Sequence, residues 1–583
     1  MPAGDQTEIV DFLKNAVNSD NDAGDAEVIE THISIIVLKG DTAWKLKRAV
    51  LLPYADFSTP ALRAAACERE VVLNRRTAPG LYLGVRRITR EPDGRLAFDG
   101  AGALADAVVE MRRFDQDTLF SRLARAGRLD PPLLTALARH IAAFHAEAEA
   151  RPDERGAANI EAVLSLNEQN TAMAALFGEA PTLALRAALR NGLERHRHRL
   201  DERARAGKIR LCHGDLHLRN LCLVDGRPTL FDCIEFNAAL ATIDTLYDLA
   251  FLLMDLWHAG LETEANRVMN RYLDESDESG ESGESGDADG LALLPFFMAL
   301  RASIRAQVLA TQAQMTDTPS REKVIAQANG YLALAMRLLE PARPRLLAIG
   351  GLSGSGKSTA AAAVAHRIGA APGARILASD RIRKQLAGVP AETALPAHTY
   401  TRESSQEVYA TLYERTARAL ATGSPVIADA VFSRPRERQA IEACARLAEV
   451  DFLGIWLEAA PAALIPRVQA RRDDASDADA GVVRQQLERG HGPVDWAVVP
   501  AGGDAESTAR GVLALALTPP WSDAPEGWNW LAQDEDGRWF WFAVPPRLGV
   551  AGGIWRSPRL AQQFAGQGVP NPLWYESCRQ RPS

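Results

Sequence analysis

The spacing of apolar residues near the start of the chain predicts strands grouped around one helix. Residues 34–38 and 43–47 are short β-prone runs, and the turn-forming pair Gly40-Asp41 between them indicates a hairpin. Residues 61–76 follow at helical spacing, and an extended region with a turn at residues 92–94 comes next.

Helical spacing dominates the following part of the chain. From residue 115 to about 206, Ala, Leu and Arg recur at helical positions. Strands and tight loops are expected at residues 211–237, and helices resume to about residue 339. An acidic stretch rich in Ser and Gly, at about residues 274–290, interrupts these helices. Such sequence buries too little apolar surface to fold, so we expect a disordered surface loop; a regulatory segment is the alternative.

A different pattern begins after residues 341–344, where two prolines are expected to stop a helix and form a linker. A short apolar run at residues 346–349 leads into a glycine-rich turn, and helices and strands then alternate to about residue 517. This alternation is typical of a parallel α/β domain.

The end of the chain is rich in tryptophan. Seven of the eleven tryptophans lie after residue 520. Two aromatic runs, residues 528–531 and 539–542, flank turn-forming residues 534–537, which predicts a hairpin with aromatic pairs across its strands. We expect these rings to form the core of a small module; a ligand platform is the alternative.

With 583 residues, the chain is too long for a single hydrophobic core. The patterns predict a multidomain protein of the α+β and α/β classes. Its expected parts are residues 1–340, residues 345–518 and a small β-containing, Trp-rich module at residues 520–583.

Composition narrows the range of partners. The chain is 47% hydrophobic and 24% charged, as in ordinary globular proteins, and its net charge of -9 argues against a nucleic-acid partner. Six cysteines without a CxxC pair indicate free thiols. The N-terminus lacks a signal-peptide pattern, and the longest apolar run, at residues 246–257, is broken by Asp248 and Asp255. We therefore expect a cytoplasmic protein without a membrane partner; the sequence leaves its oligomeric state open.

The first motif with a clear chemistry is HGDLHLRN at residues 213–220, followed by Phe231-Asp232. Transfer of a phosphoryl group to a hydroxyl needs a carboxylate that orients and deprotonates the hydroxyl, and a metal ion that neutralises the triphosphate. The spacing assigns the role of base to Asp215 and metal binding to Asn220 and Asp232.

Upstream residues supply the partners that such a centre needs. Lys45, on a predicted strand, could reach the α- and β-phosphates of ATP, and Glu70 on the following helix could hold it. Lys45 is preferred because it follows a small and an apolar residue. Lys47 points to the same face of the strand and stays possible.

Together these residues resemble the aminoglycoside phosphotransferase family of the protein-kinase-like fold, over about residues 25–335. Residues 247–250, Tyr-Asp-Leu-Ala, resemble the structural helix that follows the motif in this family. The resemblance implies a two-lobed domain that uses ATP to phosphorylate a small-molecule hydroxyl. The chain departs from the kinase pattern before Lys45, where residues 31–34 replace a glycine-rich loop.

The second motif, GLSGSGKST at residues 351–359, has the composition of a phosphate-binding P-loop. Its glycines let successive backbone N–H groups face phosphate oxygens, at the N-terminus of the next helix. Lys357 would neutralise the β- and γ-phosphates, and Ser358 would offer its hydroxyl to magnesium. The residues assigned to nucleotide binding are Gly351, Gly354, Ser355, Gly356, Lys357, Ser358 and Thr359.

Three downstream features extend this site. The apolar run at residues 425–429 ends in Asp429, a candidate metal partner of the Walker B type; a loop-capping Asp is the alternative. Asp380 and several basic residues follow the second predicted strand. Arg467, Arg471 and Arg472 precede a polar run and could belong to a lid that brings Arg471 to the phosphates, or to a solvated helix end.

Residues 345–500 resemble the small P-loop kinases, similar to gluconate and polynucleotide kinases. The resemblance implies that Asp380 contacts the acceptor or its metal and acts in catalysis. The whole arrangement resembles bacterial proteins described as bifunctional aminoglycoside phosphotransferase/ATP-binding proteins.

These observations favour a kinase that depends on ATP and Mg2+, acts on small molecules and has two transfer domains. One alternative is a regulatory nucleotide-binding protein whose P-loop domain senses or hydrolyses ATP. Another is that the Trp-rich module carries the function, by docking a carbohydrate or a protein.

Overall fold

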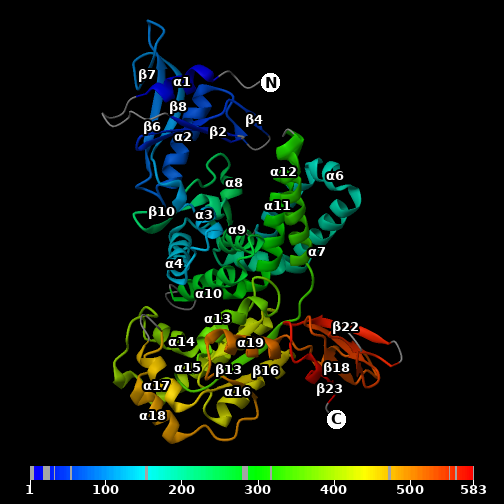
Figure 1. Ribbon diagram of the computed structural model, residues 1–583. Coiled ribbons are helices and arrows are strands. Elements are labelled where there is room, and N and C mark those ends of the chain that lie inside the picture. Colours follow the sequence, from blue (N-terminus) through cyan, green and yellow to red (C-terminus); the bar gives the residue numbers. More distant parts are fainter. Residues whose placement is uncertain are drawn as a thin grey trace. The chain divides into compact units, whose positions relative to one another are not determined.

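The computed structural model describes residues 6–16, 26–31, 33–52, 55–151, 155–278, 286–315, 318–470, 475–549, 552–558 and 561–581. The chain divides into two compact units, Met1–Glu340 and Pro341–Ser583 (Figure 1).

The first unit begins with an antiparallel sheet of six strands in the order β1-β2-β3-β8-β6-β7. The predicted hairpin is confirmed: β2 pairs with β3, and Gly40 in the turn has a φ of 52°. The predicted helix is α2, where the Thr59 hydroxyl caps the N-terminus by accepting from the Leu62 N–H. The strands are β1 (Glu27–Glu30), β2 (Ser34–Lys39), β3 (Thr42–Lys47), β6 (Tyr82–Arg90), β7 (Leu96–Phe98) and β8 (Ala103–Arg112); the helices are α1 (Thr7–Asn15) and α2 (Pro60–Asn74).

Each face of this sheet is covered by one helix. Cys67 and Val71 of α2 pack against Tyr82 and Val109 on one face. Ile9 and Leu13 of α1, together with Trp44 and Val108, form the apolar cluster on the other face. The alternation of side chains along β3 therefore points Trp44 to one core and leaves Lys45 on the opposite side.

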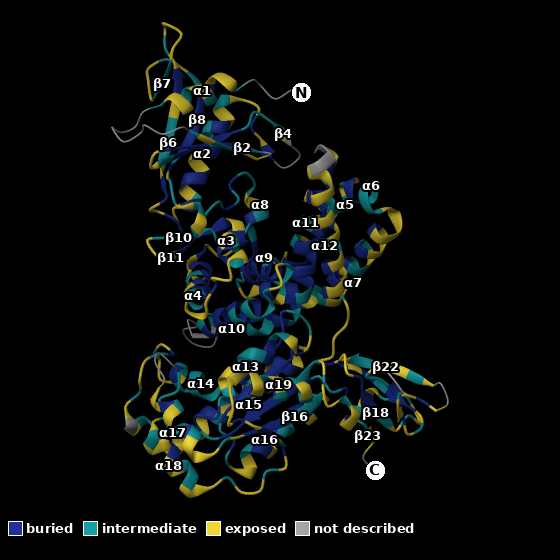
Figure 2. Ribbon diagram, viewed as in Figure 1, coloured by how far each residue is buried: buried dark blue, intermediate teal, exposed yellow. Residues whose placement is uncertain are grey.

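The rest of the first unit is mainly helical. Its centre is α9, which is buried along most of its length and packs against α10 and α11 (Figure 2). The helices are α3 (Phe120–Arg125), α4 (Pro131–Glu147), α5 (Gly156–Gln169), α6 (Ala172–Phe177), α7 (Glu179–Arg205), α8 (Ala238–Ala241), α9 (Thr245–His258), α10 (Glu262–Glu278), α11 (Leu294–Met315) and α12 (Thr318–Leu338). Two short antiparallel strand pairs flank the first motif: β9 (Ile209–Leu211) pairs with β12 (Thr242–Asp244), and β10 (Leu221–Val224) forms a hairpin with β11 (Arg227–Leu230).

The prediction of a disordered loop at about residues 274–290 is wrong at both ends. α10 continues to Glu278, and Glu275 pairs with Arg139 at 2.8 Å. At the other end Asp287 is buried and pairs with Arg203 at 2.9 Å. Arginines from distant helices offset the acidic charge there. Residues 279–285 lie outside the described part of the chain.

Among the described residues, one helical stretch, Asp287–Gln314, is long and apolar enough to cross a membrane by length and composition alone. In its most apolar window, 67% of the residues are buried inside the protein, and the core helix of a soluble protein meets the same criterion.

The second unit contains the predicted parallel sheet, with five strands in the order β14-β15-β13-β16-β17. Both faces are covered, by α13 and α19 on one side and by α15 and α16 on the other. The strands are β13 (Arg345–Gly350), β14 (Arg375–Ala378), β15 (Val426–Asp429), β16 (Asp451–Glu458) and β17 (Ala497–Pro500); the helices are α13 (Lys357–Val364), α14 (Ser379–Leu386), α15 (Arg402–Ala421), α16 (Pro435–Leu447), α17 (Pro461–Gln469), α18 (Ala480–Arg489) and α19 (Ala505–Ala516).

The Trp-rich segment forms a separate sheet in the order β22-β19-β18-β23. The predicted hairpin is confirmed, because Trp530 lies opposite Phe542 in the pair of β18 (Trp530–Gln533) and β19 (Arg538–Phe542). Trp539 and Trp541 are 3% and 2% exposed, which supports the core interpretation of the aromatic runs. The other strands of the sheet are β22 (Gln562–Gln567) and β23 (Arg579–Gln580).

Candidate functional site

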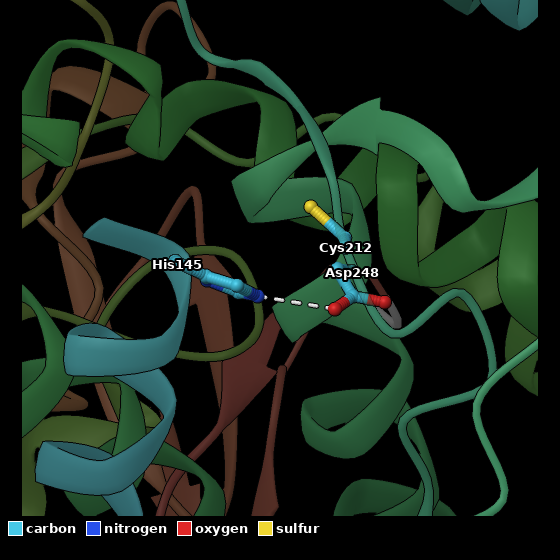
Figure 3. Close-up of side chains that lie close together, drawn as sticks. All are labelled: His145, Cys212 and Asp248. Carbon is cyan, nitrogen blue, oxygen red and sulfur yellow. Dashed lines mark hydrogen bonds and ion pairs between the residues drawn. The ribbon is translucent and has the colours of Figure 1, made fainter. Parts of the chain in front are cut away.

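A carboxylate of α9 holds the loop that carries Asp215. Asp248 accepts hydrogen bonds from the backbone N–H groups of His213, at 3.1 Å, and Gly214, at 2.8 Å. His145 of α4 lies on the same carboxylate, with Nε2 3.0 Å from Oδ2 (Figure 3). Gly214 has a φ of 83°, which favours glycine. The backbone in front of Asp215 is therefore fixed by buried contacts.

His145, Cys212 and Asp248 form the cluster drawn in Figure 3, with one potential metal-ligating atom from each residue within 4.8 Å of the others. Their atoms already have protein partners: Cys212 Sγ donates to the Ile243 carbonyl at 3.5 Å. Burial raises the pKa of the Cys212 thiol well above its usual value, and only the thiolate binds metals well. We therefore interpret this cluster as a hydrogen-bonded support of the loop rather than a metal centre.

Asp215 and Asn220 lie in contact. The Asn220 side-chain amide donates to Asp215 Oδ2 at 2.9 Å and to the Asp215 carbonyl at 3.0 Å. His217 Nε2 is 3.4 Å from Asp215 Oδ2. Although burial acts to raise it, the charges of His217, His213 and Arg305 hold the pKa of Asp215 below its usual range. The carboxylate is thus ionised, as a proton acceptor must be.

Asp232 is brought to the same place by contacts of its segment with β6 and α2. It adopts a left-handed backbone, with a φ of 62°, and its N–H donates to Tyr82 Oη at 3.0 Å. The next N–H, that of Cys233, donates to Asn74 Oδ1 of α2 at 2.9 Å. The Asn220 amide reaches the Asp232 carbonyl at 3.4 Å. The structure therefore brings Asp215, Asn220 and Asp232 together, as the spacing predicts.

The two lysines of β3 occupy different positions. Lys45 Nζ lies 2.7 Å from Glu70 Oε1 and also contacts the Asp232 carboxylate. Lys47 Nζ lies 2.5 Å from Glu70 Oε2 and contacts Glu235, and its side chain is 0% exposed. Because Lys47 is enclosed and Lys45 touches Asp232, Lys45 is the better placed to meet a phosphate. Nothing in the sequence pattern indicates the second pair, Lys47 with Glu235.

The residues of this first site suit a nucleotide with its metal. Asp232 and Asn220 offer the carboxylate and amide oxygens that Mg2+ accepts as ligands. Lys45 supplies a cation beside them, held by Glu70. The donor set therefore fits ATP and Mg2+.

In the second unit the P-loop glycines have the backbone that the motif requires. Gly351, Gly354 and Gly356 have φ values of 145°, 88° and 89°. A Cβ at Gly351 would lie 2.8 Å from the Leu457 carbonyl oxygen, and one at Gly354 would lie 2.6 Å from that of Leu464. Other residues therefore cannot replace these two glycines without displacing the backbone nearby.

The predicted magnesium partners meet at the carboxyl edge of the sheet. Ser358 Oγ donates to Asp429 Oδ2 at 2.6 Å. Asp429 ends β15, which pairs with β13, the strand that leads into the P-loop. Lys357 Nζ donates to the Leu352 carbonyl at 3.2 Å, and Thr359 follows on the exposed side of α13. Ser355 Oγ is buried without a hydrogen-bond partner among the described residues. This arrangement fits the phosphates of a nucleotide and their Mg2+.

Four further residues were singled out in the sequence, and the structure describes Asp380 and Arg467 among them. Asp380 lies in the first turn of α14, directly after β14, and β14 neighbours β15. Asp380 and Asp429 therefore follow adjacent strands at the same edge. Arg471 and Arg472 lie outside the described residues. Arg467 donates to the carbonyls of Ala501 and Gly503, each at 2.7 Å, so backbone oxygens hold its guanidinium.

The sequence did not indicate one contact of the P-loop. Gln486 of α18 accepts from the Ser353 N–H at 2.9 Å and donates to Ser353 Oγ at 3.0 Å. The polar residues around Gln486 predict a solvent-exposed side chain, so the sequence pattern does not indicate this contact. α18 is thereby tied to the phosphate-binding turn.

Comparison with known proteins finds a family model that matches part of each unit. A model of the phosphotransferase enzyme family matches residues 84–282, and a model of an AAA domain matches residues 346–493. Uncharacterized proteins of Mycobacterium tuberculosis and Mycobacterium bovis are each 30% identical over 489 residues, which cover 81% of this chain and 90% of theirs.

Solved structures with similar folds match one part of the chain each. A choline/ethanolamine kinase family protein from Mesorhizobium loti covers 58% of this chain and 95% of its own, with 16% identity and a TM-score of 0.35. The APS kinase CysC of Mycobacterium tuberculosis covers 30% of this chain and 98% of its own, with 18% identity and a TM-score of 0.23. Both TM-scores lie below 0.5, so the assignment of this chain to a family is based on the family models and the mycobacterial proteins.

Proposed function

Because the chain belongs to the same family as these mycobacterial proteins and joins a phosphotransferase domain to a P-loop domain, we propose that it is an ATP- and Mg2+-dependent kinase of a small-molecule hydroxyl. The observation that carries this proposal is the meeting of Asp215, Asn220, Asp232 and Lys45 in the first unit.

Each of these residues has a role that its contacts support. Asp215, ionised and fixed by its loop, accepts the proton of the acceptor hydroxyl. Asn220 orients the Asp215 carboxylate through a hydrogen bond of 2.9 Å. Lys45 holds the phosphates, and Glu70 keeps its ammonium group in place. Magnesium bound by Asp232 and Asn220 would neutralise charge on the triphosphate.

We assign a second phosphoryl transfer to the P-loop unit. The Ser358–Asp429 contact supports nucleotide and metal binding, and the position of Asp380 beside Asp429 supports an acceptor at the same edge. We place the protein in the cytoplasm, since all six cysteines are free and five of them are buried.

A library of metabolites incubated with γ-labelled ATP tests this function in the full-length chain. Asp215→Asn should lower transfer by the first unit by about 10²–10⁴-fold, because it removes the base. Lys357→Ala should abolish nucleotide binding by the second unit and leave the first transfer intact. Full transfer in both variants would refute the site assignment. If the chain hydrolyses ATP without transferring phosphate, and only Lys357→Ala removes this hydrolysis, an ATP-sensing role for the second unit would be favoured.

A further inference from the structure

Two arginines of α11, Arg301 and Arg305, lie near the loop that carries Asp215: Arg301 lies over Phe251, which packs on His217, and the charge of Arg305 acts on Asp215. They are four residues apart, so they share one face of the helix, one turn from each other. α11 packs against both α9 and α12 (Figure 1). Two independent sets of contacts connect this face of α11 to the loop.

The first set runs through an aromatic ring of α9. His217, which lies 3.4 Å from Asp215, packs edge-on against Phe251 with ring centroids 5.1 Å apart. The Arg301 guanidinium lies 4.8 Å from the centroid of the same ring and 3.8 Å from that of Tyr247. Arg301 is therefore separated from the loop by one layer of rings.

The second set runs through Asp255, also on α9. Asp255 accepts from the Leu218 N–H of the loop at 3.0 Å and from Tyr331 Oη at 3.2 Å. The Arg305 guanidinium lies 5.8 Å from the Tyr331 ring, and His258 stacks on that ring at 3.7 Å. Arg305 is half-buried, so it still reaches solvent.

The charges of both arginines act on acidic residues, Arg301 on Asp248 and Arg305 on Asp215, without forming an ion pair. Neither arginine has a carboxylate within ion-pair distance in the described part of the chain. Arg301 is 6% exposed, and its Nη2 has no hydrogen-bond partner among the described residues. The Arg301 Nε donates to the Tyr247 carbonyl at 3.2 Å, and its guanidinium lies over two rings, so Arg301 is enclosed and Arg305 is the arginine that a ligand can reach. Asp255 of α9 already accepts from Leu218 and Tyr331.

We propose that Arg305 binds an anionic group of the acceptor, a carboxylate or a phosphate, while Asp215 receives the proton of its hydroxyl. The planar guanidinium matches both anions with two parallel hydrogen bonds. This inference rests on the proposed kinase function and narrows its substrate to hydroxyl compounds that carry negative charge. A cationic acceptor would be repelled at the same place.

Anion binding is tested first without any acceptor, by calorimetry on the full-length chain carrying Lys357→Ala and saturated with AMP-PNP and Mg2+. Inorganic phosphate and acetate are titrated separately, which distinguishes a phosphate site from a carboxylate site. Arg305→Gln should weaken the binding of the preferred anion at least about tenfold, since charge-assisted hydrogen bonds are lost. Arg305 is the residue to replace, because Arg301 is buried in the packing.

The matched control is Arg321→Gln on α12, which removes an exposed guanidinium and should leave anion affinity unchanged. Asp215→Asn should tighten anion binding, because it removes a neighbouring negative charge. Equal affinities in the Arg305→Gln and Arg321→Gln chains, or no anion binding in the parent, would overturn the proposal.

Transfer is then measured with acceptors that differ in charge, namely glucose, gluconate, glucose 6-phosphate and choline. An anionic acceptor should show a kcat/KM at least about tenfold above that of glucose, and Arg305→Gln should remove this advantage while Arg305→Lys keeps part of it. If Asp215→Asn abolishes transfer and Arg305→Gln leaves the charge preference unchanged, the kinase function stands and the anion site is wrong. If Asp215→Asn has no effect on transfer, the kinase function fails, and the phosphate titration still decides the anion site.

Discussion

At Glu70, one buried carboxylate pairs with two lysines, Lys45 on one oxygen and Lys47 on the other. Lys47 also forms an ion pair with Glu235, three residues after Asp232. The ammonium group of Lys47 thus links α2 to the segment that carries Asp232. The two lysines look equivalent in the sequence and differ in what they reach.

Replacing each lysine by Met should separate their roles. Lys45→Met should raise the KM for ATP with a small loss of stability, because Lys45 faces the nucleotide side. Lys47→Met leaves Glu70 and Glu235 buried with less compensation, and should destabilise the first unit by about 3–5 kcal/mol. Steady-state kinetics and urea unfolding followed by circular dichroism measure the two effects. A stable Lys47→Met chain with the larger rise in KM would mean that the roles are reversed.

Acid should weaken the first unit through Glu70. Although burial acts to raise it, Lys45 and Lys47 lower the pKa of Glu70 from 4.5 to about 2. A carboxylate whose pKa is lower in the folded state stabilises the fold when the pH lies above its pKa in the unfolded state. This contribution is lost as the pH falls from about 4.5 towards 2. The unfolding free energy should therefore fall over this range, and less steeply in Glu70→Gln. Parallel pH profiles of the two chains would contradict this expectation.

Among the described helices, α9 is the one whose carboxylates accept hydrogen bonds from the backbone of the loop that carries Asp215. Asp248 holds the loop at His213 and Gly214, and Asp255, about two turns further along α9, holds it at Leu218. In the sequence both acids interrupt an apolar run, and Asp248 also belongs to the Tyr-Asp-Leu-Ala segment that resembles the family's structural helix. A charged residue in a buried helix needs a partner, so the interruptions were the available signal, but the partner depends on the tertiary fold.

Asp248→Asn should therefore lower kcat more than it changes the KM for ATP. An amide offers one acceptor oxygen where the carboxylate offers two, so one loop N–H loses its bond, and about a tenfold decrease is expected. Lys45 and Glu70 are untouched, which should leave nucleotide affinity near its original value. Steady-state kinetics over a range of ATP concentrations provide the measurement; an unchanged kcat would show that the loop does not depend on this carboxylate.

The acidic segment between α10 and α11 shows where composition misleads. Its Asp and Ser content predicts disorder, yet Arg203 of α7, 84 residues away, pairs with Asp287 and also with Asp244. By contrast, Glu70 could be predicted because a kinase-like centre needs a Glu on the helix after the strand that carries its lysine. Local spacing thus predicted Lys45, Glu70 and the P-loop residues, whereas Glu235 and Gln486 meet their partners through distant packing.

Arg203→Met tests the strength of this pairing. It leaves the carboxylates of Asp244 and Asp287 buried without their cation, and should destabilise the first unit by about 3–5 kcal/mol. Arg195→Met, an exposed position on the same helix, should change stability by less than about 0.5 kcal/mol. Differential scanning calorimetry compares the two. Equal melting temperatures would mean that the buried pairs contribute little.

For the whole molecule, each unit has an apolar core of its own. Residues 1–340 and 341–583, expressed separately, should therefore each fold. The first fragment should keep transfer that Asp215→Asn removes, and the second should keep nucleotide binding that Lys357→Ala removes. Circular dichroism and calorimetric binding measure both properties. Aggregation of either fragment, with the intact chain soluble, would show that this unit needs the other to fold.

The uneven distribution of indole rings determines what intrinsic fluorescence can report. Nine of the eleven tryptophans belong to residues 341–583, and the first unit has only Trp44 and Trp257. Emission from the intact chain will thus be dominated by the P-loop unit with its aromatic module. A melting curve recorded by tryptophan emission therefore follows the second unit. The effect of substitutions in the first unit is seen clearly only by methods to which both units contribute, such as circular dichroism or calorimetry.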